Sequence, residues 1–80
     1  MSILIKLSTT LRDCVAGYDP EAGIVVEPDA SLHTAGDLAR RIGLPEQEIK
    51  IVMINSRQSD LSSAVRDGDR VAYFPAVGGG

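Results

Sequence analysis

The closing stretch of the chain decides the fold, and it reads Val71-Ala72-Tyr73-Phe74-Pro75-Ala76-Val77-Gly78-Gly79-Gly80. Its first four residues predict a strand, because branched and aromatic side chains suit a pleated, half-buried surface. Pro75 ends that strand, since proline has no N–H to give to a sheet ladder. The glycines predict a mobile tail, because glycine costs the most entropy to order. The free carboxylate of Gly80 would then sit on a thin leader, suited to insertion into the active site of another protein.

The three glycines also have a plainer interpretation. Glycine-rich segments are typical of linkers at the edge of a domain. The rest of the chain has to distinguish a functional leader from a linker.

Length and composition indicate one small folded domain. Eighty residues allow a single core, near the lower size range of chains that fold unaided. The hydrophobic content of 44% and the charged content of 24% are those of a globular domain. A net charge of −3 argues against a nucleic-acid partner, which needs clustered lysine and arginine. A mildly acidic chain is better matched to a basic protein surface.

Cysteine usage and hydropathy predict a cytoplasmic protein. Cys14 is the only cysteine and cannot form an internal disulfide, which fits a reducing compartment. A small apolar filler is the preferred interpretation of this side chain, since only Arg12 offers positive charge nearby. No apolar run approaches the length that spans a bilayer, and Met1 begins no secretory signal, so no membrane partner is expected.

Working back from the closing strand, hydrophobic periodicity predicts three further strands, at residues 3–7, 24–26 and 49–54. The first places Ile3, Ile5 and Leu7 on one face, because side chains alternate along a strand. Residues 12–23 are rich in turn formers and predict a loop that joins a hairpin. Residues 57–65 are short and polar and predict a brief strand or helical turn.

One helix is predicted between Thr34 and Gly43. Thr34 is a capping residue, and Asp37 three positions later completes a shortened capping box. Gly43 stands just after the end of the helix, where a left-handed backbone conformation is favoured, and Pro45 prevents continuation of the helix. A single apolar stripe faces the core, formed by Ala35, Leu38, Ala39 and Ile42.

This order of elements predicts a mixed sheet with one helix on one face. One helix covers one face only, yet residues 51–54 and 71–74 are apolar on both sides. Apolar surface is therefore expected on the open face, with Phe74 and Pro75 as members of a partner site. The alternative is that the loop 14–23 covers these strands.

Residues that carry chemistry are nearly absent. The glycines are not accompanied by the lysine of a phosphate-binding loop. One histidine, His33, and one cysteine cannot build a zinc site, so no metal is expected. The carboxylates Asp67 and Asp69 are explained by the turn around Gly68. By elimination, the terminal carboxylate is the one unusual group.

The chain resembles the MoaD/ThiS family of ubiquitin-like β-grasp sulfur carriers, which includes the molybdopterin synthase small subunit and the thiamin-pathway sulfur carrier. Four segments carry the resemblance: 34–38, 41–45, 52–55 and, most specifically, 65–80 with its Asp-Gly-Asp turn, Phe-Pro strand end and glycine terminus. The resemblance covers nearly the whole chain and disfavours the linker interpretation. It implies an α+β, β-grasp fold with four to five strands and one main helix, over residues 1–75, followed by a flexible tail at 76–80.

The resemblance also implies a function. In this family an E1-like adenylating enzyme uses ATP to activate the last glycine, here Gly80, which then becomes a thiocarboxylate with sulfur from a persulfide donor. Gly78 and Gly79 would thread the enzyme channel, and Phe74, Pro75 and Val77 would bind partners. The sulfur would pass to a synthase, either the molybdopterin synthase large subunit or thiazole synthase. The chain itself would be a carrier with no bound cofactor, not an enzyme.

The terminus combines features of two branches. The Phe74-Pro75 pair resembles molybdopterin-type carriers and favours that pathway, whereas the Val-Gly-Gly-Gly ending resembles thiamin-type carriers. A protein modifier, conjugated to lysines through Gly80, begins from the same adenylate and stays an alternative. A plain interaction module would leave the tail dispensable.

Overall fold

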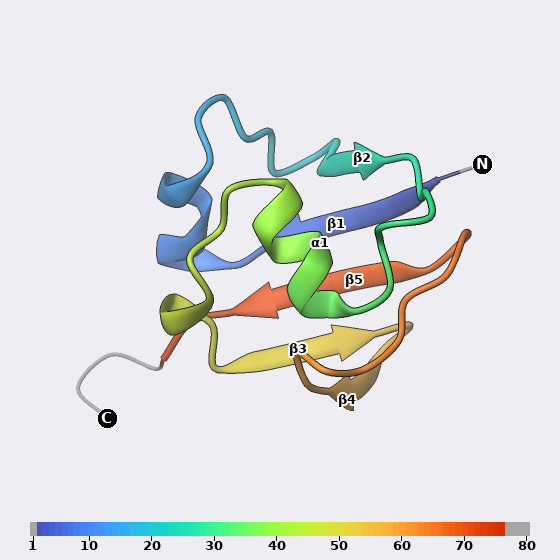
Figure 1. Ribbon diagram of the computed structural model, residues 1–80. Coiled ribbons are helices and arrows are strands. Elements are labelled where there is room, and N and C mark those ends of the chain that lie inside the picture. Colours follow the sequence, from blue (N-terminus) through green and yellow to red (C-terminus); the bar gives the residue numbers. More distant parts are fainter. Residues whose placement is uncertain (1, 77–80) are drawn as a thin grey trace.

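A computed structural model describes residues 2–76 and shows a five-stranded mixed sheet with one α-helix on one face (Figure 1). Val77, Gly78, Gly79 and Gly80, to which the sequence assigned roles, lie outside the described residues. The predicted α+β, β-grasp architecture is confirmed. In chain order the elements are β1 (Ile3–Leu7), the 3₁₀ helix η1 (Thr9–Cys14), β2 (Ile24–Val26), α1 (Ala35–Arg41), the 3₁₀ helix η2 (Glu46–Glu48), β3 (Ile51–Ile54), β4 (Arg57–Ser59) and β5 (Arg70–Phe74).

The last strand of the chain lies in the middle of the sheet. The spatial order is β2-β1-β5-β3-β4, so β5 is inserted between the first strand and the third (Figure 1). β5 pairs in parallel with β1, with Lys6 opposite Ala72, and antiparallel with β3, with Met53 opposite Ala72. The stretch that decides the fold in the sequence is therefore also the strand that joins its two halves.

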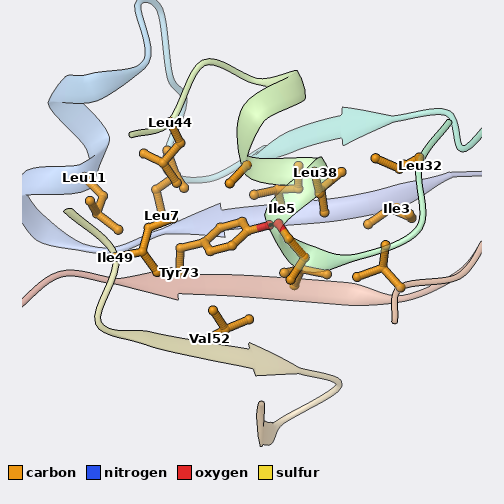
Figure 2. Close-up of a cluster of buried hydrophobic side chains, with 14 residues drawn as sticks. Ile3, Ile5, Leu7, Leu11, Leu32, Leu38, Leu44, Ile49, Val52 and Tyr73 are labelled. Atoms are coloured by element: carbon orange, nitrogen blue, oxygen red, sulfur yellow. Dashed lines mark hydrogen bonds between the residues drawn. The ribbon is translucent and has the colours of Figure 1, made fainter. Parts of the chain in front are cut away.

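The core lies between the sheet and α1. Ile3, Ile5 and Leu7 are buried on one face of β1, as their alternation predicts. Figure 2 shows the ring of Tyr73 in the middle of the cluster, between the sheet and the helix. The buried hydrophobic residues of the core are Ile3, Ile5, Leu7, Leu11, Leu32, Ala35, Leu38, Ala39, Leu44, Ile49, Val52, Val65, Val71 and Tyr73.

Tyr73 ties the central strand to the start of the helix. Its buried hydroxyl donates a hydrogen bond of 2.6 Å to the carbonyl oxygen of Ala35. Tyr73→Phe removes this bond while keeping the ring, and we expect the free energy of unfolding to fall by about 1–2 kcal/mol. Burial also raises the pKa of the phenol, so wild-type stability should decline as the pH rises above the ordinary phenol value, a loss that the phenylalanine variant lacks. Urea unfolding at neutral and alkaline pH measures both effects, and an unchanged midpoint at neutral pH would contradict the first.

The predicted helix signals are all present in α1. The Thr34 hydroxyl accepts from the Asp37 N–H at 3.1 Å, and the Asp37 carboxylate accepts from the Thr34 N–H at 3.0 Å. These two bonds are the capping box. Gly43 adopts a φ of +80°, the left-handed geometry that ends a helix. Arg40 pairs with two carboxylates and Arg41 with a third, and both arginines stand in the last turn, where positive charge complements the helix dipole.

Asp29 connects the segment before the helix to the last helical turn. Its carboxylate lies 3.1 Å from an Arg41 nitrogen and accepts from the Ser31 backbone N–H at 2.9 Å. The bonds to Arg41 and Ser31 lower the pKa of Asp29 from 3.8 to about 2. Because the folded-state pKa is depressed, this stabilisation is complete above the unfolded-state value and is lost as the pH falls from about 4 towards 2. Asp29→Asn should therefore flatten the acid limb of a plot of melting temperature against pH, and an unchanged limb would contradict the assignment.

Several local expectations were incomplete or wrong. Residues 12–23 were predicted to form a loop, but the first of them belong to η1, whose Leu11 is buried in the core. Cys14 is exposed, so the interpretation as an apolar filler is wrong. The third strand starts at Ile51 rather than at residue 49. The polar segment 57–65 was predicted to form a brief strand or a helical turn, and its first residues form the strand β4. A tight turn leads into β4, and in it Asn55 and Ser56 have φ values of 52° and 68°.

Candidate functional site

The end of β5 is fixed on both sides at the point where the chain leaves the sheet. The backbone N–H of Ser8 donates to the carbonyl oxygen of Tyr73 at 3.2 Å, and that of Lys50 donates to the carbonyl oxygen of Phe74 at 2.8 Å. β5 points towards the end of the sheet where η1 and η2 lie (Figure 1). The residue after Phe74 is Pro75, which has no N–H with which to continue a ladder. The exit point of the tail is thus set by hydrogen bonds from two neighbouring segments.

A shallow hollow of about 600 Å³ surrounds this exit. We call it the exit hollow; its lining residues are Ser8, Thr9, Thr10, Ile51, Phe74, Pro75 and Ala76. Phe74 and Pro75 are half-buried here, so part of each ring faces solvent beside the exposed Ala76. The structure places these two predicted partner-binding residues together, and Val77 lies outside the described residues. Their binding role stays a prediction.

The face of the sheet opposite α1 is open and largely apolar. Alternation along the strands places Leu4, Lys6, Ile51, Met53, Arg70, Ala72 and Phe74 on it, and we call these residues the open face. Ile51 is 37% exposed, and Val25 of β2, which pairs with Leu4, is 63% exposed. The expected exposure of apolar surface on this side is confirmed.

The loop that follows η1 does not cover the open face. No residue from 14 to 23 lines either the exit hollow or the hollow on the open face. The loop contacts this side at β1: the ammonium group of Lys6 donates to the carbonyl oxygens of Pro20 and Glu21, and Gly23 lies beside the side chains of Leu4 and Lys6. The alternative that the loop shields the central strands is therefore wrong.

Some residues of this site were not foreseen. Ser8, Thr9 and Thr10 reach the exit hollow because β1 and β5 are parallel, so that both strands end at the same edge of the sheet. A pairing between residues so distant in the chain leaves no local signal. The placement of Leu4 and Lys6 on the open face, in contrast, follows from the alternation in the first strand.

The described part of the chain offers no metal site and no membrane span. Within residues 2–76 no group of three or more histidine, cysteine, aspartate or glutamate side chains could hold a metal ion. No helix in that range is long and apolar enough to cross a bilayer. His33 is exposed.

A five-stranded mixed sheet with the last strand central, a single helix on one face and a partly apolar open face define a ubiquitin-like β-grasp protein. The chain belongs to the Mut7-C ubiquitin family, whose family model matches residues 1–78. This membership confirms the resemblance to ubiquitin-like carriers of the MoaD/ThiS type. A search of curated proteins found no match.

Solved structures agree with this assignment. SAMP1 from Haloferax volcanii is 25% identical, with a TM-score of 0.68 and complete coverage of both chains. The HVO 2177 protein of the same organism is 28% identical with a TM-score of 0.70, over 100% of this chain and 87% of that one. Urm1 from Trypanosoma brucei has a TM-score of 0.71 at 14% identity, over 99% and 95% of the two chains, and shows likeness of fold alone. Family and fold together support a general carrier role.

Proposed function

We propose that this chain is a sulfur carrier whose Gly80 carboxylate is adenylated by an E1-like enzyme and converted to a thiocarboxylate. The observation that carries the proposal is the position of the glycine terminus. It follows a central strand whose last carbonyl groups are held from both sides, by the N–H groups of Ser8 and Lys50. A rigid body thus ends in a segment of minimal side-chain bulk, which is what a channel leading to a nucleotide requires.

The chemistry needs a good leaving group on a poor electrophile. A carboxylate oxygen of Gly80 would attack the α-phosphorus of ATP and release pyrophosphate. The terminal sulfur of a persulfide would then attack the acyl carbon and displace AMP. A second thiol would release the thiocarboxylate by forming a disulfide with the donor. The partner enzymes supply ATP binding and catalysis, and the chain supplies the acyl group and the docking surface, so we assign it as a carrier rather than an enzyme.

The pathway is a finer part of the same proposal. The Phe74-Pro75 pair, which resembles the strand end of molybdopterin-type carriers, favours molybdopterin biosynthesis, with the molybdopterin synthase large subunit as sulfur acceptor. The glycine ending leaves the thiamin pathway and thiazole synthase as the alternative. Both routes would use an adenylating enzyme and a persulfide donor in the cytoplasm. Conjugation of Gly80 to lysines of other proteins would begin from the same adenylate.

Intact mass spectrometry tests the proposal. The full chain, verified to end at Gly80, is incubated with ATP, an E1-like adenylating enzyme and a persulfide donor. A gain of about sixteen mass units, the replacement of one oxygen by sulfur, supports the carrier. No change with an enzyme proven active on another carrier would overturn it. Attachment of the chain to other proteins, without the mass gain, would replace the carrier by the modifier.

A further inference from the structure

The outer side of β1 has no strand partner at its last residue. The pairing of β1 with β2 stops at Ile5. The N–H groups of Leu4 and Ser8 point to the β5 side, where they donate to carbonyl oxygens. Because backbone groups alternate in direction along a strand, the N–H and the carbonyl of Leu7 point the other way, past the end of β2. Unpaired backbone groups at such a position are costly, so these two groups need other partners.

Tyr18 and Arg12 supply those partners. The phenolic oxygen of Tyr18 accepts from the Leu7 N–H at 2.8 Å, and its O–H donates to the Leu7 carbonyl oxygen at 3.5 Å. The Nε–H of Arg12 donates to the same carbonyl oxygen at 3.0 Å. The ring of Tyr18 is half-buried and packs against the core. These two side chains take the place of the missing strand, and we call them the clasp.

The clasp acts on the peptide group that fixes the tail exit. The carbonyl of Leu7 and the N–H of Ser8 belong to one planar peptide group. The clasp holds the carbonyl on one side, and on the other side the N–H donates to the carbonyl oxygen of Tyr73 at 3.2 Å. A rotation of this plane would break the bonds to the clasp and the bond to β5 together. The clasp and the exit are therefore mechanically coupled.

The residue that follows this peptide group has a strained backbone. Thr9 lines the exit hollow with a φ of +44°, in the left-handed region that a β-branched residue seldom adopts. Conformations of this kind persist only where the surrounding structure over-determines them. The bonds of the clasp to Leu7 and of Ser8 to β5 fix the path of the chain into Thr9. The turn at the exit is thus held in place from outside.

The loop after η1 is anchored on both sides of Tyr18. The N–H of Tyr18 donates to the carbonyl oxygen of Val15 at 3.3 Å, which closes a tight turn. Further along the loop, the ammonium group of Lys6 holds the carbonyl oxygens of Pro20 and Glu21. These anchors keep the phenol at the end of β1. The loop leaves the open face uncovered, and the clasp gives it a role at the exit instead.

We infer that Tyr18 and Arg12 are positioning residues for the tail, which act through the peptide group after Leu7 and hold the exit in one direction. This inference rests on the proposed function and adds what directs the terminal carboxylate. Four residues follow Ala76, and even fully extended they span at most about 14 Å. With so short a reach, the direction of the exit decides where the carboxylate can arrive. A carrier that holds this direction for only part of the time binds its enzyme more weakly by that fraction.

Steady-state kinetics of thiocarboxylate formation test the inference with Tyr18→Phe and Thr34→Ala. The first removes the hydroxyl of the clasp and keeps the ring. The second removes the helix cap, which also lowers stability but lies outside the exit hollow. Tyr18→Phe should raise the KM for the carrier about fivefold with kcat within about twofold, because the enzyme selects the competent direction before the reaction. Thr34→Ala should leave both constants within about twofold of wild type. Equal effects of the two variants, or an unchanged KM in Tyr18→Phe, would overturn the inference.

Arg12 is tested by the same kinetics. Arg12→Met removes the remaining donor to the Leu7 carbonyl, and in the Tyr18→Phe background it should raise the KM further, to about tenfold above wild type. A double variant with the same KM as Tyr18→Phe would overturn the assignment of Arg12.

Amide hydrogen exchange, followed by NMR on the ¹⁵N-labelled chain, tests the clasp without any enzyme. In Tyr18→Phe the Leu7 amide loses its acceptor. The Ser8 amide keeps its own acceptor, yet it should exchange at least about tenfold faster, because the other side of its peptide group is released. The Asn55 amide, which donates to the Arg70 carbonyl oxygen at the far end of the sheet, should keep its rate after correction for global stability. A Ser8 rate unchanged relative to Asn55 would overturn the coupling.

The two measurements separate failure of the inference from failure of the proposed function. If the wild-type chain is not adenylated, the proposed function fails and the positioning of the tail fails with it, while the exchange rates still decide the clasp. If the chain is adenylated and Tyr18→Phe releases the Ser8 amide without a change in KM, the proposed function stands and the positioning role is overturned.

Discussion

Removal of Gly80 is expected to abolish thiocarboxylate formation completely while leaving the fold intact. The truncated chain still ends in a carboxylate, but that group would stop one residue, about 3.5 Å, short of the position at which the nucleotide is attacked. The core is built from residues between Ile3 and Tyr73, so the free energy of unfolding should change by less than about 0.5 kcal/mol. Intact mass after the adenylation and sulfur-transfer reaction measures the first effect, and thermal unfolding measures the second.

Extension of the chain provides a second test of the same carboxylate. One serine added after Gly80 keeps every native residue and all described contacts, yet it moves the terminal carboxylate outward and replaces the glycine at the reacting position. We expect the same loss of the mass gain as in the truncated protein. If either variant gained sulfur at the wild-type rate, the reacting group would not be the Gly80 carboxylate and the interaction module would become the better assignment.

Gly23→Ala is expected to be among the most destabilising single changes in the described chain. Gly23 stands immediately before β2 with a φ of +72°, and a Cβ atom there would lie 2.6 Å from the carbonyl oxygen of Ile5 and 3.1 Å from a methyl carbon of Leu4. The oxygen is backbone in the central part of the sheet and cannot move aside. The left-handed conformation costs an alanine about 1–2 kcal/mol, and the collision adds to it, so a total loss of about 2–4 kcal/mol is expected. A domain of this size has about 4–12 kcal/mol of stability, so the loss is a large share of the total.

Gly17→Ala separates the two contributions. Gly17 has nearly the same φ, +74°, but no atom lies within 4 Å of a Cβ built there. It should therefore lose only the conformational cost of about 1–2 kcal/mol. Urea unfolding of the two variants, with unchanged dependence on urea concentration, measures the difference. Equal midpoints for the two variants would show that β2 moves away from β1 without cost and that the close approach is unimportant.

The sequence predicted those features that depend on neighbours in the chain. The alternation of Ile3, Ile5 and Leu7 identified the buried face of the first strand, because a strand repeats every two residues. Thr34 and Asp37 identified the start of the helix, because the capping box closes over four residues. The turn at Gly68, with a φ of +91°, was found for the same reason. The apolar character of the open face also followed, since one helix covers only one side of a sheet.

Features that depend on distant pairings were missed. The contribution of residues 8–10 to the exit hollow arises because β1 and β5 end side by side, although Leu7 and Tyr73 are far apart in the chain. The exposed position of Cys14 depends on η1, a short 3₁₀ helix whose sequence carries no strong helical signal. Net charge also does not show that the ion pairs among residues 2–76 gather on α1 and that Lys6 and Arg70 have no carboxylate within ion-pairing distance in that range.

The sequence by itself determined the four main strands and the helix of this protein, its resemblance to a ubiquitin-like family and the glycine ending that suggests a carrier. These are properties of local periodicity and of short motifs, and they require no knowledge of which strands pair. The tertiary structure alone decided the central position of β5, the two hydrogen bonds that fix the tail exit, and the continuity of the exit hollow with a cationic open face. Strand order is set by the burial of one common core by all strands and the helix, a global free-energy minimum that no single segment encodes.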